Sequence, residues 1–285
     1  RSSAVPREHV GGALGFLQTA MTVGWLVGPL AGGAVSDRLG FRMTFQCTGA
    51  MLLVAAALVG LLVREPPRPA PSEESGYLAN LKLLRHQPAL RGVMATVFLS
   101  SGAVMMLNPQ LPLLVTEMLP GRADVAAVVG LVTAAPALTS MVAAPLWGRA
   151  GDRYGHGRVL PMALACGSLL HPWGALVAAP WQLILLRAGV GIGSAAISPA
   201  AHALVAQQVA ETRTAGAFSL LASAQMLGAA IGPMLGGGVA QWIGIRPLFL
   251  MSAIVLALAA ATAARAAGAA RRIAPPAPQP DSDSS

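Results

Sequence analysis

The sequence predicts an all-α membrane protein with eight transmembrane helices. Of its 285 residues, 55% are hydrophobic and only 11% are charged, whereas soluble domains carry about 25% charged residues. A helix needs about 20 mostly apolar residues to cross a bilayer. The apolar stretches show no two-residue alternation, which excludes the strands of a membrane barrel. The expected spans are residues 11–35, 43–63, 92–116, 125–147, 159–178, 180–206, 215–243 and 247–267.

The charge pattern indicates topology rather than a nucleic-acid partner. The net charge is +8, but the 19 basic residues are spread over interhelical loops instead of one face. If both termini share one side, that side holds fourteen Lys and Arg residues, while the other holds only Arg38, Arg42, Arg122 and Arg246. The positive-inside rule therefore predicts that both termini are cytoplasmic.

The sequence gives no sign of an enzyme, a cofactor or a metal site, so none is expected. Lys82 is the only lysine, and no phosphate-binding loop precedes it. A dinucleotide-like pattern at residues 191–196 lies inside an apolar span rather than after a strand. Cys47 and Cys166 also fall in apolar spans, where packing is their expected role.

An internal repeat links the first and seventh spans. Residues 24–45 share nine identities with residues 228–249, and these include glycines and a proline at fixed offsets. The identical positions of the second copy include Gly228, Gly232, Pro233, Gly236 and Gly237. Six spans separate the copies, so both copies have the same orientation across the bilayer. Such parallel halves are typical of transporters whose substrate site lies between them.

The repeat also predicts how the chain is divided. Spans seven and eight pair with spans one and two, but spans three to six have no partners, so four preceding helices are expected. Residues 1–63 are then the last two helices of an N-terminal half, and residues 64–91 a cytoplasmic linker with a short surface helix. Residues 92–270 form a complete six-helix C-terminal half. A disordered cytoplasmic tail is expected over residues 271–285.

The first span carries a second, longer pattern of the form G-x8-G-x3-G-P-x2-G-G. Its members are Gly15, Gly24, Gly28, Pro29, Gly32 and Gly33. This pattern resembles the fifth-helix signature of the drug:proton antiporter branch of the major facilitator superfamily. The resemblance implies helices 5 to 12 of a twelve-helix fold in a bacterial inner membrane. It further implies proton-coupled export of drugs or other small hydrophobic molecules, with a monomer as the complete protein.

The glycines of this signature predict close helix packing. Gly24, Gly28 and Gly32 are four apart and form a nearly continuous ridge on a helix. Pro29 removes a helical hydrogen bond and favours a kink. Two interpretations remain open: the ridge seals one side during rocking of the halves, or it serves packing alone.

A second family pattern, G-x3-D-R-x-G, occurs between the fourth and fifth expected spans. Its residues are Gly148, Asp152, Arg153, Gly155 and, three positions on, Arg158. The resemblance implies a cytoplasmic gating loop, and the alternative is a solvated turn with topogenic arginines. A similar run at residues 33–42, with Asp37 and Arg38, falls on the external side, where it is interpreted as a relic or a turn signal.

Polar residues within the spans indicate a substrate cavity. Gln18, Asn108, Gln110 and Gln225 are uncharged candidates for its lining, and Arg187 is the one ionisable residue well inside a span. For Arg187, function and snorkelling to the external edge are both open. Because Asp and Glu are missing from the expected spans, coupling carboxylates are expected in the preceding helices, or else the chain is not proton-coupled.

Two rival functions remain at this point. The first is a transporter of the same fold that carries a sugar, a siderophore or a metabolite instead of a drug. In the second, the chain is a non-transporting membrane fragment of a truncated gene. The expected partners in the main interpretation are a small-molecule substrate, protons and the lipid bilayer.

Overall fold

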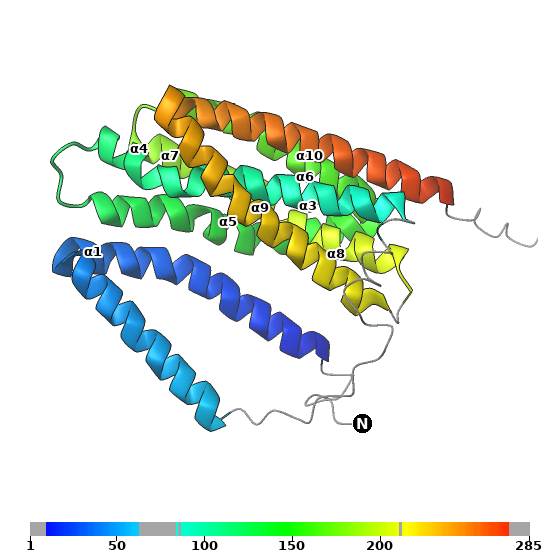
Figure 1. Ribbon diagram of the computed structural model, residues 1–285, viewed down its shortest axis with the longest axis horizontal. Coiled ribbons are helices and arrows are strands. Elements are labelled where there is room, and N and C mark those ends of the chain that lie inside the picture. The colour runs from blue at the N-terminus through cyan, green and yellow to red at the C-terminus, as the bar shows by residue number, and fades with distance from the viewer. Residues whose placement is uncertain (1–9, 63–83, 85–86, 211–212, 274–285) are drawn as a thin grey trace, which may run out of the picture.

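The fold is helical throughout the part of the chain that is described. The computed structural model describes residues 10–62, 84, 87–210 and 213–273 (Figure 1). Its helices are α1 (Val10–Leu62), α3 (Pro88–Leu107), η3 (Asn108–Gln110), α4 (Leu111–Met118), α5 (Val125–Tyr154), α6 (His156–Leu170), η4 (His171–Leu176), α7 (Pro180–Ser194), α8 (Ile197–Gln208), α9 (Thr214–Ile243) and α10 (Arg246–Ile273). η3 and η4 are 3-10 helices.

Seven helical runs in this part of the chain are long and apolar enough to cross a membrane. The chain is therefore an integral multi-pass membrane protein, as its composition predicts. Three of the runs join neighbouring elements: α3 with α4, α6 with η4, and α7 with α8. The expected boundaries at residues 92 and 206 agree with these runs to within a few residues.

The first two expected spans lie in one element, α1. Its backbone leaves the helical region at Gly40, where φ is 80° and ψ is 164°. A positive φ of this kind favours glycine because side chains with a Cβ rarely adopt it. Figure 1 shows the consequence: α1 consists of two arms that fold back at a sharp bend.

The first arm is longer than expected. The helix continues beyond residue 35 to Leu39, so Asp37 lies inside it rather than in a loop, as the expected boundary had it. Pro29 lies inside the helix, and the non-helical residue of α1 is Gly40 instead. Membrane helices tolerate proline where neighbouring groups adjust to the lost hydrogen bond, and the corner at Gly40 lies within residues 36–42, which separate the first two expected spans.

The repeat extends from sequence to backbone geometry. Gly244, the partner of Gly40 in the second copy, follows α9 with φ of 86° and ψ of 174°. Both copies therefore turn a corner at the same position with nearly the same glycine conformation.

Two other expected segments lie largely outside the described residues. The linker helix falls on residues 63–83 and 85–86, although Leu84 is described and packs against the apolar core. α3 begins at Pro88, inside the segment expected as linker. α10 continues to Ile273, and the rest of the expected tail is not described.

The core of the bundle surrounds α3. This helix packs against α9, α10 and α8, while α5 packs against both α1 and α7. Two apolar clusters fill the interior, one around Leu90, Leu160 and Leu221 and another around Leu107, Leu183 and Phe249. The outer surface is also apolar, with Trp25, Leu185 and many others more than half exposed, which suits contact with lipid.

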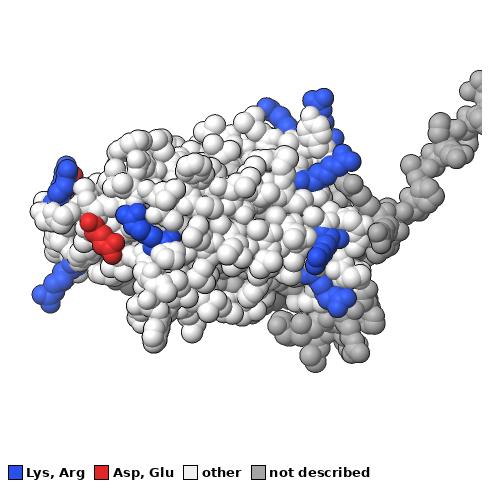
Figure 2. Space-filling view, turned by 90° about the horizontal axis from the view of Figure 1, so that it is seen from above, with Lys and Arg blue, Asp and Glu red and all other residues white. Residues whose placement is uncertain are grey.

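Exposed charged side chains lie toward the ends of the face seen in Figure 2. Figure 2 shows Lys, Arg, Asp and Glu gathered at its two ends, with uncharged residues between. Arg38, Arg42 and Arg122 lie at the end that holds the α1 corner and the α4–α5 loop. The corner between α5 and α6, with Arg153 and Arg158, lies at the opposite end.

Candidate functional site

The second copy of the glycine ridge forms a backbone-to-backbone seam. Gly228, Gly232 and Gly236 of α9 are buried, and α9 has its most extensive contact with α3. A Cβ at these three positions would overlap the carbonyl oxygens of Phe98, Gly102 and Met106, respectively. Those carbonyls are themselves four residues apart, so the ridge follows successive turns of α3. Contacts of this kind bring Cα–H groups close to carbonyl oxygens.

The last glycine of the second copy reaches a polar residue. A Cβ at Gly237 would lie 3.7 Å from Nε2 of Gln110. Pro233 lies inside α9 next to this seam, without ending the helix.

The first copy of the ridge is arranged differently. A Cβ at Gly24, Gly28 or Gly32 would meet nothing within 4 Å among the described residues. Gly33 instead contacts Ala126 of α5, and Gly130 of α5 contacts the carbonyl of Pro29. Gly15 and Gln18 lie in α1, but the structure does not describe the Gln18 side chain.

Arg187 is buried, which contradicts the snorkelling interpretation. Its side chain is 6% exposed, and its Nη2 donates a hydrogen bond of 3.0 Å to Oδ1 of Asn108. Its Nε is buried without a hydrogen-bond partner. No Asp or Glu of the described residues forms an ion pair with it. The Arg187 guanidinium is therefore enclosed by helices and does not reach the lipid edge. Its hydrogen bond to Asn108 links α7 to the junction of α3 with η3.

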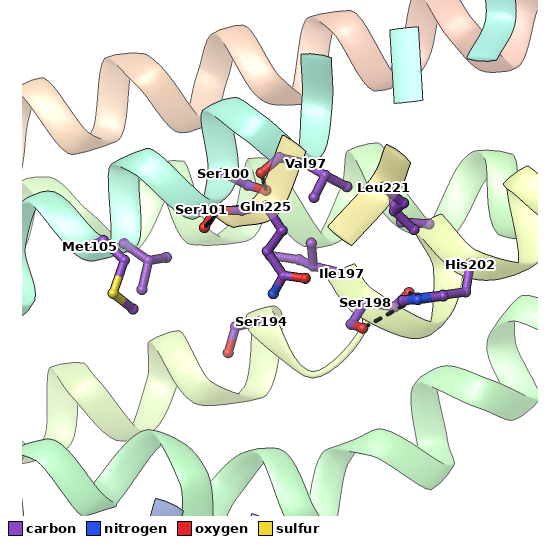
Figure 3. A pocket seen from close by; sticks show the side chains of 12 residues that line it. Val97, Ser100, Ser101, Met105, Ser194, Ile197, Ser198, His202, Leu221 and Gln225 are labelled. Carbon is purple, nitrogen blue, oxygen red and sulfur yellow. Dashed lines mark hydrogen bonds between the residues drawn. The ribbon is translucent and has the colours of Figure 1, made fainter. Parts of the chain in front are cut away.

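A cavity of about 190 Å³ lies between α3, α9 and the junction of α7 with α8. Figure 3 shows the Gln225 amide extending from α9 into this space toward that junction. Ser101 Oγ donates a 2.8 Å hydrogen bond to the backbone carbonyl oxygen of Gln225, which ties α3 to α9 at the cavity wall. The lining consists of Val97, Ser100, Ser101, Val104, Met105, Ser194, Ile197, Ser198, Ala201, His202, Leu221 and Gln225.

The expected cavity residues do not all line this cavity. Gln225 lines the cavity, whereas Asn108 and Arg187 meet elsewhere in the bundle and Gln110 is buried beside Gly237. Sequence reasoning missed the polar wall made by Ser194, Ser198 and His202. Ser198 and His202 are four residues apart on α8 and so share one face of that helix, which is the signal that points to them; Ser194 ends the preceding helix α7.

The cavity wall includes an ordered imidazole. His202 Nδ1 lies 2.8 Å from the Ser198 carbonyl oxygen, and its ring packs edge-on against Phe218 with centroids 5.2 Å apart. The cavity therefore offers hydroxyl, amide and imidazole groups among apolar side chains, and its described lining includes no carboxylate. Such a wall suits uncharged or amphipathic molecules.

The loop pattern of residues 148–158 makes the corner between α5 and α6. Gly155 has φ of 86° and ψ of 135°, while Asp152, Arg153 and Arg158 are exposed. The Arg153 guanidinium lies 5.3 Å from the centroid of the Tyr154 ring. Asp152 forms no hydrogen bond or ion pair with another described residue.

Gly155→Ala is expected to lower stability, because alanine is strained at this φ by about 1–3 kcal/mol. Gly148→Ala is the matched control, since Gly148 lies inside α5 and a Cβ there has no neighbour within 4 Å. Thermal unfolding in detergent should show a lower Tm for Gly155→Ala and an equal or higher Tm for Gly148→Ala. Equal Tm values for Gly155→Ala and the parent would contradict the backbone assignment.

Comparison with known proteins decides the family. The family model described as Major Facilitator Superfamily matches residues 2–121 and 123–284. The chain belongs to the Major Facilitator Superfamily. Its relatives include the multidrug resistance protein MdtG of Enterobacter lignolyticus, which is 30% identical over 256 residues. That match covers 90% of this chain and 61% of the relative.

Other comparisons agree with membership of the Major Facilitator Superfamily. MdtG of Salmonella typhi is also 30% identical over 256 residues, which cover 63% of its length. The crystal structure of a bacterial homologue of the human lysosomal transporter Spinster has a TM-score of 0.70 and 16% identity, covering 96% of this chain and 74% of that one. The fucose:proton symporter FucP of E. coli has a TM-score of 0.55 and 17% identity, covering 80% and 55%. These structures share the superfamily fold.

The chain spans less than two thirds of the length of these MdtG relatives. These relatives are named as multidrug resistance proteins. In the described residues no group of three or more His, Cys, Asp or Glu side chains is placed to hold a metal ion.

Proposed function

We propose that this chain forms helices 5 to 12 of a twelve-helix transporter that exports drugs or other small hydrophobic molecules in exchange for protons. The observation that carries this proposal is the 30% identity over 256 residues to proteins named for multidrug resistance. The likeness to a fucose symporter, at 17% identity, concerns the fold and gives no support to a sugar substrate.

The proposed count of eight helices follows from the Gly40 corner. The two arms of α1 then correspond to helices 5 and 6, and the elements from α3 to α10 to helices 7 to 12. Residues 1–63 close the N-terminal half, residues 64–91 link the halves, and residues 92–270 form the C-terminal half ahead of a tail at 271–285. The close contact of α1 with α5 is then the interface between the halves.

The proposed orientation places both termini in the cytoplasm of a bacterial cell and the α1 corner outside the inner membrane. The excess of arginine at the end opposite that corner supports this orientation. A monomer is proposed for the complete transporter, with the substrate bound between the halves.

The glycine seam and the cavity supply the proposed mechanism of substrate handling. α3 and α9 touch through their backbones, so they move as one rigid unit when the halves rock. The cavity beside them offers pliable Met105 and several hydroxyl groups to substrates of varied shape. Asp152, Arg153 and Arg158 at the α5–α6 corner are proposed to form the cytoplasmic gating loop.

The test is an efflux assay on the gene product that contains this chain. Expression in a drug-hypersensitive bacterial host is expected to lower the accumulation of a fluorescent hydrophobic dye several-fold. Collapse of the proton gradient with a protonophore should abolish the difference. Equal dye accumulation with and without the membrane-inserted protein, over a panel of hydrophobic drugs, would refute drug export.

A further inference from the structure

Asp37 joins two parts of the chain that are far apart in sequence. It lies in the last turn of the first arm of α1, and its carboxylate reaches the N-terminus of α5. Oδ1 accepts a 3.0 Å hydrogen bond from the Ala126 N–H, and Oδ2 accepts a 2.6 Å bond from the Ala127 N–H. Asp37 is partly buried there.

The two hydrogen bonds replace a cap that α5 lacks. The first N–H groups of a helix have no partner within it, and they attract negative charge. Asp124 occupies the N-cap position but makes no capping bond. Its carboxylate accepts bonds of 2.8 and 2.7 Å from Arg122 instead, and these lower the pKa of Asp124. The α5 N-terminus is therefore capped from α1.

Among the described residues, close backbone approaches between α1 and α5 lie at the corner end of the arm. Gly33 contacts Ala126, and Pro29 contacts Gly130, so the two backbones touch over the last turns before Gly40. Earlier in the same arm, Val23, Trp25 and Val27 are exposed. Breaking the Asp37 bonds would thus act on the place where α1 and α5 are held together.

The corner itself does not require an acid. In the second copy of the repeat, Gln241 stands at the position of Asp37, and Gly244 still turns the corner with φ of 86°. The Asp-Arg-x-Gly pattern also recurs at the opposite end of the molecule, where Asp152 is exposed and forms no hydrogen bond or ion pair with another described residue. Within the described part of the chain, Asp37 therefore bonds to a neighbouring helix and Asp152 does not.

We propose that Asp37 is a latch that holds the α1 and α5 ends closed at the corner side of the transporter and releases when that side opens. The residue run interpreted from sequence as a relic then has a function, as a positioning group between the two halves. This inference rests on the proposed transport function, in which the halves rock.

The latch is tested with Asp37→Asn and Asp37→Ala in the gene product that contains this chain. Cys47 and Cys166 are first replaced by serine, and spin labels are attached at Leu39, which is 58% exposed, and at Ala123, which is also exposed. Loss of a helix cap is expected to raise the population with a long label distance, relative to the population with a short one, by about five- to thirtyfold. Asp124→Asn is the matched control, because it removes a carboxylate at the same helix end that does not bridge to α1. It should leave the ratio unchanged.

Two results would overturn the latch: unchanged distances in both Asp37 variants, or an equal shift in the Asp124→Asn control. Asp37→Asn preserves the side-chain shape, so it reports on the latch even if Asp37→Ala fails to fold. Dye efflux is measured in the same variants to separate this inference from the proposed function. A shifted distance ratio in a protein that exports no drug supports the latch and refutes drug export, whereas export with unshifted distances does the reverse.

Discussion

Gly232→Leu is expected to abolish transport while leaving the protein inserted in the membrane. A Cβ at this position would overlap the Gly102 carbonyl oxygen, and that atom belongs to the α3 backbone and has no rotamer to change. α9 must then move away from α3 along the whole seam. Overpacking of this kind costs about 1–3 kcal/mol or more, yet the apolar character that drives insertion rises with leucine. Dye efflux and membrane-fraction yield measure the two effects separately.

Two matched variants sharpen this prediction. Gly238→Leu, six residues along the same helix, should retain efflux, because a Cβ at Gly238 meets nothing within 4 Å. Gly28→Leu changes the equivalent of Gly232 in the first copy, where the described residues also leave open space. Loss of efflux in Gly28→Leu would show that the first ridge is packed in the assembled transporter. Parental efflux from Gly232→Leu would contradict the proposal that the contact between α3 and α9 is needed for transport.

Arg187→Gln is expected to lower transport at least about tenfold, an effect of roughly 1.4 kcal/mol or more. The substitution removes a buried positive charge and withdraws the donor from Oδ1 of Asn108, at the point where α3 gives way to η3. An unsatisfied buried acceptor costs about 1–3 kcal/mol. Efflux rate and Tm, measured together, show how much of the loss comes from instability.

Arg187→Lys separates charge from geometry. Lysine keeps the charge but lacks the planar fork of donors, so its efflux should lie between the parent and Arg187→Gln. Arg265→Gln is the control for loss of an exposed arginine and should leave efflux unchanged. Parental efflux from Arg187→Gln would contradict a role in transport, and an unchanged Tm would contradict a role in packing.

The sequence was sufficient for most of the fold, for a physical reason. Long apolar segments must form helices in a bilayer, since every backbone polar group has to be satisfied within the segment. The repeat further predicts that the second glycine ridge is a packing surface, and Gly228, Gly232 and Gly236 do lie against α3. The turn between the first two spans was also predicted, since residues 36–42 include Gly40, but the structure shows that the helix continues to Leu39 before it turns.

The parts that sequence could not supply depend on distant contacts. Asp37 accepts hydrogen bonds from the backbone N–H groups of residues 126 and 127. Every residue except proline has such a donor, so the sequence does not indicate which ones Asp37 binds. Whether Arg187 turns inward or outward depends on Asn108, which lies 79 residues away. The cavity wall likewise combines residues of α3, α7, α8 and α9, and of its polar side chains only Gln225 was predicted from its place in a span.

The most direct test of drug export is transport by the purified gene product in liposomes with an imposed pH difference. Dye movement across the membrane and the internal pH are followed together. The account predicts dye flux coupled to a proton flux in the opposite direction, and no such coupling in Gly232→Leu. Dye flux that ignores the pH difference, or a pH difference that dissipates equally without dye, would contradict proton-coupled export.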